Sequence, residues 1–228
     1  MPHPTFYNLP QRKRAALEAA AIEEFARHGL AAASTNAIIG NAKIPKGSFY
    51  QYFVDKEDLY QYIQTLIKAT KKELAAALPL PENPMDTFEY LRWLLELEFL
   101  FARGFPQLAR IEQLAFLENP LPEKADAQSE DPSASDPRFQ ALLAQGIVHE
   151  DIATWVDAGL GAHVLELVTH LIAPYLISRL DGVAKGSQQD STTLTLDEEA
   201  QSLLDNLMEI LEAGMARDPQ VRKNYYTK

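Results

Sequence analysis

The chain has 228 residues, enough for one large domain or for a small domain and a larger one. Its composition, 46% hydrophobic and 23% charged, is typical of a soluble globular protein. It contains no cysteine, which excludes disulfides, a thiol nucleophile and thiolate-held metal or iron–sulfur sites. The first residues lack the layout of a signal peptide, and Glu166 lies near the middle of the most apolar stretch. We therefore expect a cytoplasmic protein without a membrane-spanning segment.

Charge is unevenly distributed along the chain. Residues 1–78 carry ten Lys or Arg and seven Asp or Glu, a net charge of +3. The whole chain has a net charge of −11, so residues 79–228 carry −14. DNA phosphates would repel the acidic part and attract the basic part. An acidic protein without a nucleic-acid partner could show the same small excess, so this charge asymmetry alone does not identify a DNA-binding part.

The N-terminal part predicts four helices. Apolar residues recur at helical spacing, and helices are expected over residues 11–28, 35–42, 46–53 and 56–78. Ala15, Leu17, Ala21, Ile22 and Phe25 form the apolar stripe of the first helix. Gly29 is predicted to end that helix, and Ser34 and Asp55 are predicted N-caps. Asp58, at the third position after Asp55, indicates a variant of the capping box.

The C-terminal part is also predicted to be helical. Residues 79–84 form a proline-rich break, and helices are expected over residues 85–102, 106–117, 138–145, 150–180 and 197–215. Residues 119–137 and 182–195 are predicted loops. We find no strand pattern and no repeat, so the predicted fold class is all-α. The predicted domains are a DNA-binding head over residues 1–55, connected by helix 56–78 to a body over residues 79–228.

Residues 34–59 are typical of a helix-turn-helix motif. A short helix, a tight turn and a second short helix are followed by a third helix that opens at Asp55. In this motif the second helix lies in the major groove and presents side chains to base edges. We expect Lys46, Gly47, Ser48 and Gln51 to face the bases. Gly47 permits close backbone approach, Gln51 can pair with adenine, and Lys46 can donate to guanine or to phosphate.

Other residues of the motif are predicted to contact phosphates, and each has an alternative interpretation. Ser34, Thr35 and Asn36 lie at a helix N-terminus, which favours an anion; Tyr50 and Tyr52 offer hydroxyls, and Lys56 offers an ammonium. Ser34 could serve only as a cap, and Tyr52 could be half-buried packing. Phe49 and Phe53 are expected in the core.

The segment P-K-G-S-F-Y-Q-Y-F-V-D-K-E-D-L (45–59) resembles the signature of the tetracycline-repressor (TetR/AcrR) family of transcriptional regulators. The preceding A-I-E-E-F-A-R-H-G-L-A-A-A-S-T-N-A-I-I (21–39) resembles the first and second helices of that family. The resemblance covers about residues 12–65. It implies a three-helix DNA-binding head and a larger helical body that dimerises and binds a small-molecule effector. It places Ser34, Thr35, Lys46, Ser48, Tyr50, Tyr52 and Lys56 at family positions near DNA, with Gly47 at the start of the recognition helix.

Two residues depart from the family pattern. Lys43 occupies the turn position where the family usually has glycine, and a left-handed conformation there would cost about 1 kcal/mol. Ile39 stands where the family often has alanine, which predicts that the two helices of the motif pack slightly further apart.

The resemblance implies a homodimer in which the last two long helices pair with their symmetry mates in a four-helix bundle. Two sets of apolar residues fit this surface: Leu203, Leu207, Ile210 and Leu211 on one helix, and Leu160, Val164, Leu167, Val168, Leu171 and Ile172 on the other. The alternative is that both are ordinary core helices of one subunit.

The effector site is predicted in the body. Residues 88–101 are apolar nearly all round and include Glu96 and Glu98, a composition that suits a small-molecule pocket. The candidate lining residues are Trp93, Glu98, Phe101, Phe116, Trp155 and His163. We expect an apolar or amphipathic effector and no cofactor; the alternative is that these residues are plain core.

His163, Glu166 and His170 share one predicted helix face. Imidazole and carboxylate groups can hold zinc, but this spacing spreads them over two turns and no H-E-x-x-H pattern occurs. A hydrogen-bonded network at the dimer seam is therefore favoured over a metal site.

Three functions remain open from the sequence. The first is a ligand-responsive transcriptional regulator, most often a repressor in the family, that binds a near-palindromic DNA operator as a homodimer. The second is a helical small-molecule-binding or adaptor protein without DNA binding. The third is an enzyme with a carboxylate–histidine site on the long C-terminal helix, but it lacks a nucleophile–base set and a phosphate-binding glycine loop, so we expect no enzyme.

Overall fold

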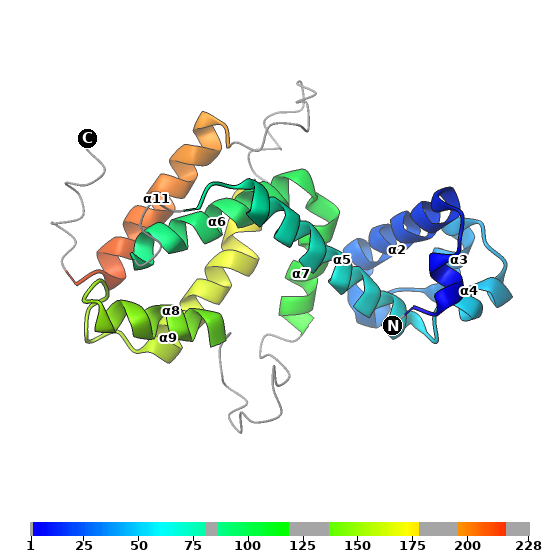
Figure 1. The fold of residues 1–228 in the computed structure, drawn as a ribbon, viewed down its shortest axis with the longest axis horizontal. Coiled ribbons are helices and arrows are strands. Elements are labelled where there is room, and N and C mark those ends of the chain that lie inside the picture. The colour runs from blue at the N-terminus through cyan, green and yellow to red at the C-terminus, as the bar shows by residue number, and fades with distance from the viewer. Residues whose placement is uncertain (1, 81–85, 119–136, 178–195, 218–228) are drawn as a thin grey trace. The chain divides into compact units, whose positions relative to one another are not determined.

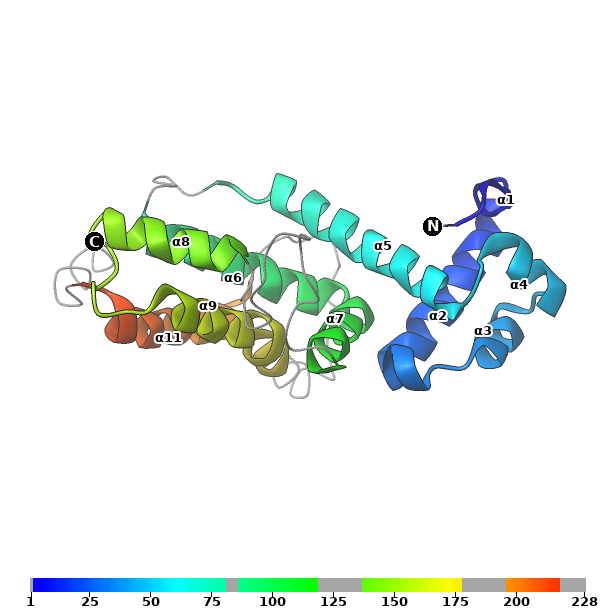
Figure 2. The same ribbon diagram turned by 90° about the horizontal axis from the view of Figure 1, so that it is seen from below.

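The computed structural model describes residues 2–80, 86–118, 137–177 and 196–217 (Figures 1 and 2). Within these ranges the chain is built of helices, and the β-structure consists of one isolated antiparallel bridge between Ile152 and Ala216. The predicted all-α fold is confirmed. The predicted loops at 119–137 and 182–195 and most of the predicted break lie outside the described residues, except that Pro137 begins a helix.

The chain divides into two compact units. The head unit comprises Met1–Ala75 and Phe105–Pro120, and the body unit comprises Ala76–Gly104 and Leu121–Lys228. The helices of the head unit are α1 (Pro4–Tyr7), α2 (Gln11–Ala32), α3 (Thr35–Ala42), α4 (Lys46–Tyr52), α5 (Lys56–Ala77) and α7 (Pro106–Glu118). All except α1 correspond to predicted helices, with ends that differ by a few residues at most.

Side-chain caps define the helix starts in the head. Ser34 Oγ accepts the backbone N–H of Ala37 at 3.3 Å, and Asp55 Oδ1 accepts that of Asp58 at 2.7 Å. Asp58 in turn accepts the backbone N–H of Val54 at 3.1 Å, so its carboxylate reaches back across the cap. Both predicted N-caps and the predicted capping-box variant are confirmed, because this chemistry acts within four residues.

Helix α2 is interrupted at Gly29, which is where the sequence predicted the end of this helix. Gly29 itself leaves helical geometry, with φ 68°, and the chain then makes a further turn to Ala32. Only glycine adopts this φ at no steric cost. A Cβ at Gly29 would also lie 2.0 Å from Glu118 Oε1, because α7 packs along α2 at this point.

The head core contains large side chains from every helix of the motif. The fully buried ones are Phe6, Leu17, Phe25, Ile38, Phe49, Phe53, Leu59 and Ile63. Ala15 was predicted in the apolar stripe of α2, and this is wrong: it is exposed. It lies two residues before the buried Leu17, and residues two apart on a helix point about 200° apart.

The body unit contains α6 (Thr87–Gly104), α8 (Pro137–Val148), α9 (Ala158–Leu167), a π-helical turn η1 (Val168–Ile172) and α11 (Glu198–Met215). Helix α9 and η1 belong to one continuous helical stretch, Ala158–Ile177. Helix α8 packs beside α9, and α6 packs against both α8 and α11 (Figure 1).

The predicted helix over residues 150–180 is wrong in its first part. Residues 150–157 form a loop, and α9 begins only after Asp157, whose Oδ1 accepts the backbone N–H of Leu160 at 2.8 Å. The loop makes backbone hydrogen bonds to the end of α11, from Ala153 N to Met215 O at 2.8 Å and from Arg217 N to Asp151 O at 3.0 Å. These hydrogen bonds to a distant segment take the place of the backbone hydrogen bonds that a helix would make within residues 150–157.

Helix α11 starts at a charged cap. Asp197 accepts the backbone N–H of Ala200 at 2.9 Å and pairs with Arg103 of α6 at 2.6 Å. The Ala200 N–H holds the pKa of the Asp197 carboxyl below its usual value, and Arg103 lowers this pKa further. The cap therefore stabilises α11 and also attaches it to α6.

Candidate nucleic-acid interface

Helix α4 presents the residues that were predicted to face base edges. Lys46, Gly47 and Gln51 are exposed and Ser48 is half-buried. Pro45 is the residue before the helix, with φ −62°, and it leaves the first turn open to solvent. The geometry is that of a short helix with one polar side free to enter a groove.

The opposite side of α4 is anchored in the head core. Phe49 and Phe53 are fully buried, with ring centroids 5.9 Å apart, as predicted. On α3, Ile38 is fully buried and Ile39 is 8% exposed, so the first helix of the motif is attached to the same core. The wider packing of the two helices expected from Ile39 stays a prediction.

The turn between α3 and α4 contains a left-handed residue that is not glycine. Lys43 has φ 52° and ψ 42°, and its backbone N–H donates to Gly40 O at 3.2 Å. The position is thus left-handed, as family glycines at this place suggested, and the lysine side chain costs about 1 kcal/mol there. In return the turn carries an exposed cation beside α4.

The segment from the end of α2 to the end of α4 carries cations without acidic residues. Residues 25–54 contain Arg27, Lys43 and Lys46 and no Asp or Glu. Both lysines are exposed. Phosphate attraction depends on such a local excess of cations rather than on the net charge of the chain, which is −11.

The N-terminus of α3 is held by a buried carboxylate that the sequence analysis missed. Glu24 is only 8% exposed, and its Oε1 accepts the backbone N–H of Ser34 at 2.8 Å. Ser34 and Asn36 are exposed and Thr35 is half-buried, so the first turn of α3 faces solvent. The position of Glu24 next to the apolar Phe25 could have indicated that Glu24 is buried. No residue near Glu24 in the sequence identifies Ser34 as its partner.

Lys56 lies close to the same junction. Its Nζ donates to the backbone carbonyls of Ala31 and Ala33, each at 3.2 Å, and so closes the C-terminal end of α2. The lysine ammonium has three N–H donors, so one donor remains for a phosphate after these two hydrogen bonds. The phosphate contact of Lys56 stays a prediction. The two hydrogen bonds to the end of α2 give Lys56 a structural role that the sequence did not predict.

The two tyrosines of α4 differ in exposure. Tyr50 is 49% exposed and meets Phe49 edge-to-face at 5.3 Å. Tyr52 is half-buried, which agrees with the alternative that it contributes to packing. Next to it, burial raises the pKa of Tyr62, and the Glu18 carboxylate that accepts its hydroxyl at 2.5 Å raises this pKa further. Tyr62 therefore stays a neutral donor within the core of the head.

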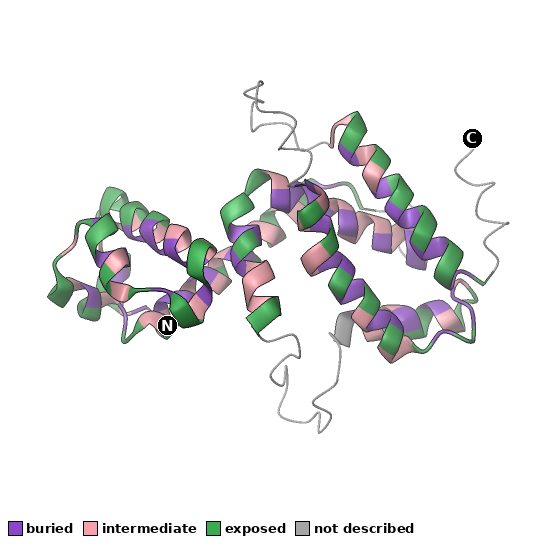
Figure 3. Ribbon diagram, turned by 180° about the vertical axis from the view of Figure 1, so that it is seen from behind, coloured by how far each residue is buried: buried purple, intermediate pink, exposed green. Residues whose placement is uncertain are grey.

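In the body, α9 exposes apolar residues along one side. Leu160 is 66% exposed, Val164 40% and Leu167 45%, and we call these three residues the apolar face of α9. Beyond them Ile172 is 39% exposed, whereas Val168 is buried and Leu171 is half-buried. Figure 3 shows the alternation of buried and exposed residues along these helices. Residues four and seven positions apart lie on one side of a helix, so the three form a continuous strip.

The apolar stripe of α11 is used mainly within the subunit. Leu207 and Leu211 are buried and Leu203 is half-buried, because this side of α11 packs against α6. Ile210 is 69% exposed. For Leu207 and Leu211 the alternative of ordinary core packing therefore describes the structure, and the outward apolar surface is smaller than the sequence suggested.

The predicted effector-lining residues do not all lie together. Within the body unit, Phe101 is buried, and Trp93 and Glu98 are half-buried on the same helix, α6. The indole Nε1 of Trp93 is buried without a hydrogen-bond partner, and its ring stacks on Tyr90 at 5.8 Å. Trp155 lies on the loop before α9 and is 75% exposed, so it encloses nothing in this subunit. Phe116 is half-buried on α7 of the head unit.

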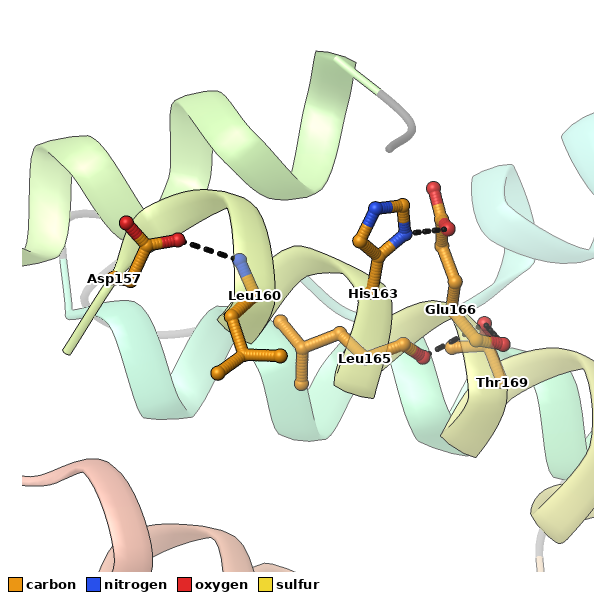
Figure 4. Close-up of polar contacts among 6 residues, drawn as sticks. All are labelled: Asp157, Leu160, His163, Leu165, Glu166 and Thr169. Carbon is orange, nitrogen blue, oxygen red and sulfur yellow. Dashed lines mark hydrogen bonds and ion pairs between the residues drawn. The ribbon is translucent and has the colours of Figure 1, made fainter. Parts of the chain in front are cut away.

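The polar groups of α9 form a local network (Figure 4). His163 Nδ1 lies 3.2 Å from Glu166 Oε2, and the carboxylate is buried. Thr169 donates to the carbonyls of Leu165 and Glu166, at 3.0 and 3.1 Å, where the π-helical turn begins. Across the residues that the structure describes, His, Asp and Glu side chains form no group of three suited to a metal ion.

The stretch Ala158–Ile177 is long and apolar enough to cross a membrane by length and composition alone. Part of it is buried inside the body unit, against α8. Core helices of soluble proteins have the same length and composition, so this helix is weak evidence for a membrane span.

Comparison with known proteins agrees with the geometry of the head. Residues 17–63 match the family model described as bacterial regulatory proteins of the tetR family. The chain is 30% identical to the HTH-type transcriptional repressor SCO4008 of Streptomyces coelicolor over 122 residues, which are 52% of this chain and 59% of the repressor. The match thus spans less than two thirds of that relative.

Solved structures extend the similarity to the body. A TetR family transcriptional regulator from Chloroflexus aurantiacus superposes with a TM-score of 0.75 and 31% identity, over 96% of this chain and all of the other. FadR of Bacillus subtilis, solved in complex with stearoyl-CoA, has a TM-score of 0.54 and 16% identity, over 88% of this chain and 98% of the other, which shows the shared fold alone. The resemblance of the recognition motif, the match of the head and the full-length similarity agree: the chain belongs to the TetR family of bacterial transcriptional regulators.

Proposed function

We propose that the protein is a ligand-responsive transcriptional repressor that binds a near-palindromic operator as a homodimer. The observation that carries this proposal is α4: its polar side is exposed, its apolar side is anchored by Phe49 and Phe53, and no carboxylate lies within residues 25–54. Lys46 and Gln51 are the proposed base-reading residues, with Gly47 and Ser48 at the closest approach. Ser34, Thr35, Asn36, Tyr50, Tyr52 and Lys56 are the proposed phosphate contacts.

Dimerisation supplies the second recognition helix. One short helix reads few base pairs, and twofold dimers place two such helices in successive major grooves. The apolar face of α9 supports this proposal, since three large aliphatic side chains are otherwise exposed to water. Ile210 on α11 is the proposed contribution of the last helix.

The proposed effector is a small apolar or amphipathic molecule bound in the body. The half-buried Trp93, with its unpaired indole N–H, and the buried Phe101 offer an apolar wall with one hydrogen-bond donor. FadR of Bacillus subtilis binds stearoyl-CoA, and another structure of this fold is named a gamma-butyrolactone receptor. Both ligands belong to the proposed chemical class.

Repression and a cytoplasmic location are proposed by analogy with the relatives. SCO4008 is named a repressor, and operator binding by this chain would act in the same sense. A DNA-binding regulator works where the chromosome is, so the proposed location is the cytoplasm. We propose no enzymatic activity.

The test is a selection of random duplex DNA on the purified protein, read by sequencing. An enriched palindrome with two half-sites supports the proposal, and it gives the operator for affinity measurements. Lys46→Ala and Gln51→Ala should weaken binding to that operator, with Gln51→Ala relaxing the preference at one base step. Lys68→Ala, which removes an exposed cation of α5 outside the motif, is the matched control. If the folded wild-type dimer enriched no sequence, with or without candidate effectors, the result would favour the alternative of a ligand-binding protein that does not bind DNA.

A further inference from the structure

The N-terminal segment before α2 was not assigned any role by its sequence. It contains α1, four residues long, which packs against α4. Its central residue, Phe6, is fully buried, although Thr5 and Tyr7 on either side are exposed. A single buried aromatic in so short a helix indicates a segment held by tertiary contacts, because four residues cannot sustain a helix alone.

The first set of contacts is polar and ends on the last residues of α4. The backbone N–H of His3 donates to Tyr52 O at 2.8 Å, and the Thr5 hydroxyl donates to Gln51 O. The last carbonyls of any helix lack intrahelical partners, and in a helix of seven residues they are a large share of all carbonyls. The N-terminal segment thus closes the C-terminal end of α4 from a distance of more than forty residues along the chain.

The second set of contacts is apolar. The Phe6 ring centroid lies 4.9 Å from that of Phe53, 5.0 Å from that of Tyr62 and 6.4 Å from that of Tyr52. Tyr62 is fixed in turn by its hydrogen bond to Glu18 of α2. Phe6 therefore fills the space between α4 and α5, and one face of Tyr52 rests against it.

These contacts hold two residues to which the proposed function gives direct roles. Gln51 is the proposed base reader and Tyr52 a proposed phosphate contact, and the segment binds the backbone carbonyl of each. Contacts to base edges require side chains held within about half an ångström of the productive geometry. We propose that Thr5 and Phe6 are positioning residues of the recognition helix, so that operator affinity and specificity depend on a segment outside the helix-turn-helix motif. This inference rests on the proposed function.

The test measures operator affinity of the full chain by fluorescence anisotropy, using the selected duplex and a scrambled duplex of equal length. Thr5→Val keeps the shape of the side chain and removes the hydroxyl. It should weaken operator binding about threefold to tenfold, the value of one hydrogen bond, while scrambled-duplex binding changes little. Thr5→Ser retains the donor and should restore the affinity. Phe6→Leu should act in the same direction as Thr5→Val, and Phe6→Ala should act more strongly.

Three controls separate positioning from other roles. All variants are compared at a temperature where thermal denaturation shows each to be fully folded, and Asn8→Ala serves as an exposed neutral change in the same segment. The salt dependence of operator binding should not change, because none of these substitutions removes a charged group. Amide exchange should quicken at residues 51–53 in Thr5→Val, where the capped carbonyls lie.

The possible results distinguish a failure of the positioning role from a failure of the proposed function. Equal operator affinity of wild type and Thr5→Val, with both folded, overturns the positioning role and leaves the proposed function intact. An equal loss of affinity for the operator and the scrambled duplex in Thr5→Val overturns it in favour of direct phosphate contact. A wild-type chain that enriches no duplex overturns the proposed function together with this inference.

Discussion

The head and the body bury their large apolar residues to different degrees. In the head, Ile38, Phe49 and Phe53 of the motif are fully buried within one subunit. In the body, α9 has one side packed against α8 and another side, its apolar face, exposed. A helix that is apolar nearly all round requires cover on both sides. The head is therefore complete as a single unit, whereas the body leaves a surface that a second subunit can cover.

The largest effect is expected from a substitution that removes a large side chain from the core of the head. Phe53→Ala should lower the free energy of unfolding of the head unit by about 3–5 kcal/mol, because the fully buried ring leaves a cavity beneath α4. Amide exchange read by mass spectrometry should show faster exchange in head peptides. The neighbouring Val54 is 62% exposed, so Val54→Ala should change stability by less than about 0.5 kcal/mol. Similar effects of the two changes would contradict the description of this core.

The next effect tests the open surface of the body. Leu167→Glu places a charge on the apolar face of α9, and a twofold interface would receive it twice. The dissociation constant of the dimer should rise about thirtyfold or more, equivalent to about 2 kcal/mol at a central interface position. Sedimentation equilibrium measures the change. Val54→Glu puts the same charge on an exposed apolar residue of the head and should leave assembly unchanged; an unchanged Leu167→Glu dimer would place the interface elsewhere.

A smaller effect tests the buried carboxylate at the α2–α3 junction. Glu24→Leu should lower the free energy of unfolding by about 1–3 kcal/mol, because the backbone N–H of Ser34 loses its acceptor in a part-buried site. Chemical denaturation measures the loss. Glu24→Gln keeps an acceptor oxygen and should retain most of the stability. If Glu24→Gln and Glu24→Leu were equally destabilising, the charge of the Glu24 carboxylate, and not this hydrogen bond, would account for its contribution to stability.

The smallest effect concerns pH and the cap of α11. The pKa of Asp197 is lowered in the folded chain, so its contribution to stability is present above the unfolded pKa and is lost as pH falls through the folded pKa. Asp197→Asn keeps a capping oxygen and removes the charge that pairs with Arg103. It should cost less than about 1 kcal/mol at pH 7, since the pair is partly exposed, and should cost nothing in strong acid. Thermal denaturation across pH measures this; a cost that persists in acid would show that the charge is not its cause.

Features that depend on neighbouring residues were predicted well from the sequence. The bounds of α3 were predicted as observed, and the caps at Ser34 and Asp55 were confirmed, because capping acts within one helical turn. The family pattern raised a left-handed conformation at Lys43 only as a condition, and the structure shows that this conformation is present. The exposed side of α4 was expected from the helix-turn-helix motif, whose second helix presents side chains to base edges.

Features that join distant segments were not predicted. The loop over residues 150–157 was read as helix, since its composition suits a helix and its hydrogen bonds run to the end of α11. The docking of α1 on α4 depends on Phe6 meeting Phe53, and no local pattern pairs these two rings. The division of α11 into a buried stripe and an exposed Ile210 depends on where α6 lies.

The sequence by itself determined most of the helices, the helix-turn-helix motif and the resemblance to the family, because periodicity, caps and turn residues act over a few positions. Only the tertiary structure decided which residues hold the recognition helix from behind and which side of α9 stays uncovered. Glu24, Lys56 and Phe6 each contact groups between 10 and 56 residues away along the chain. Such partners are set by the packing of whole helices, and no spacing rule within one segment encodes them.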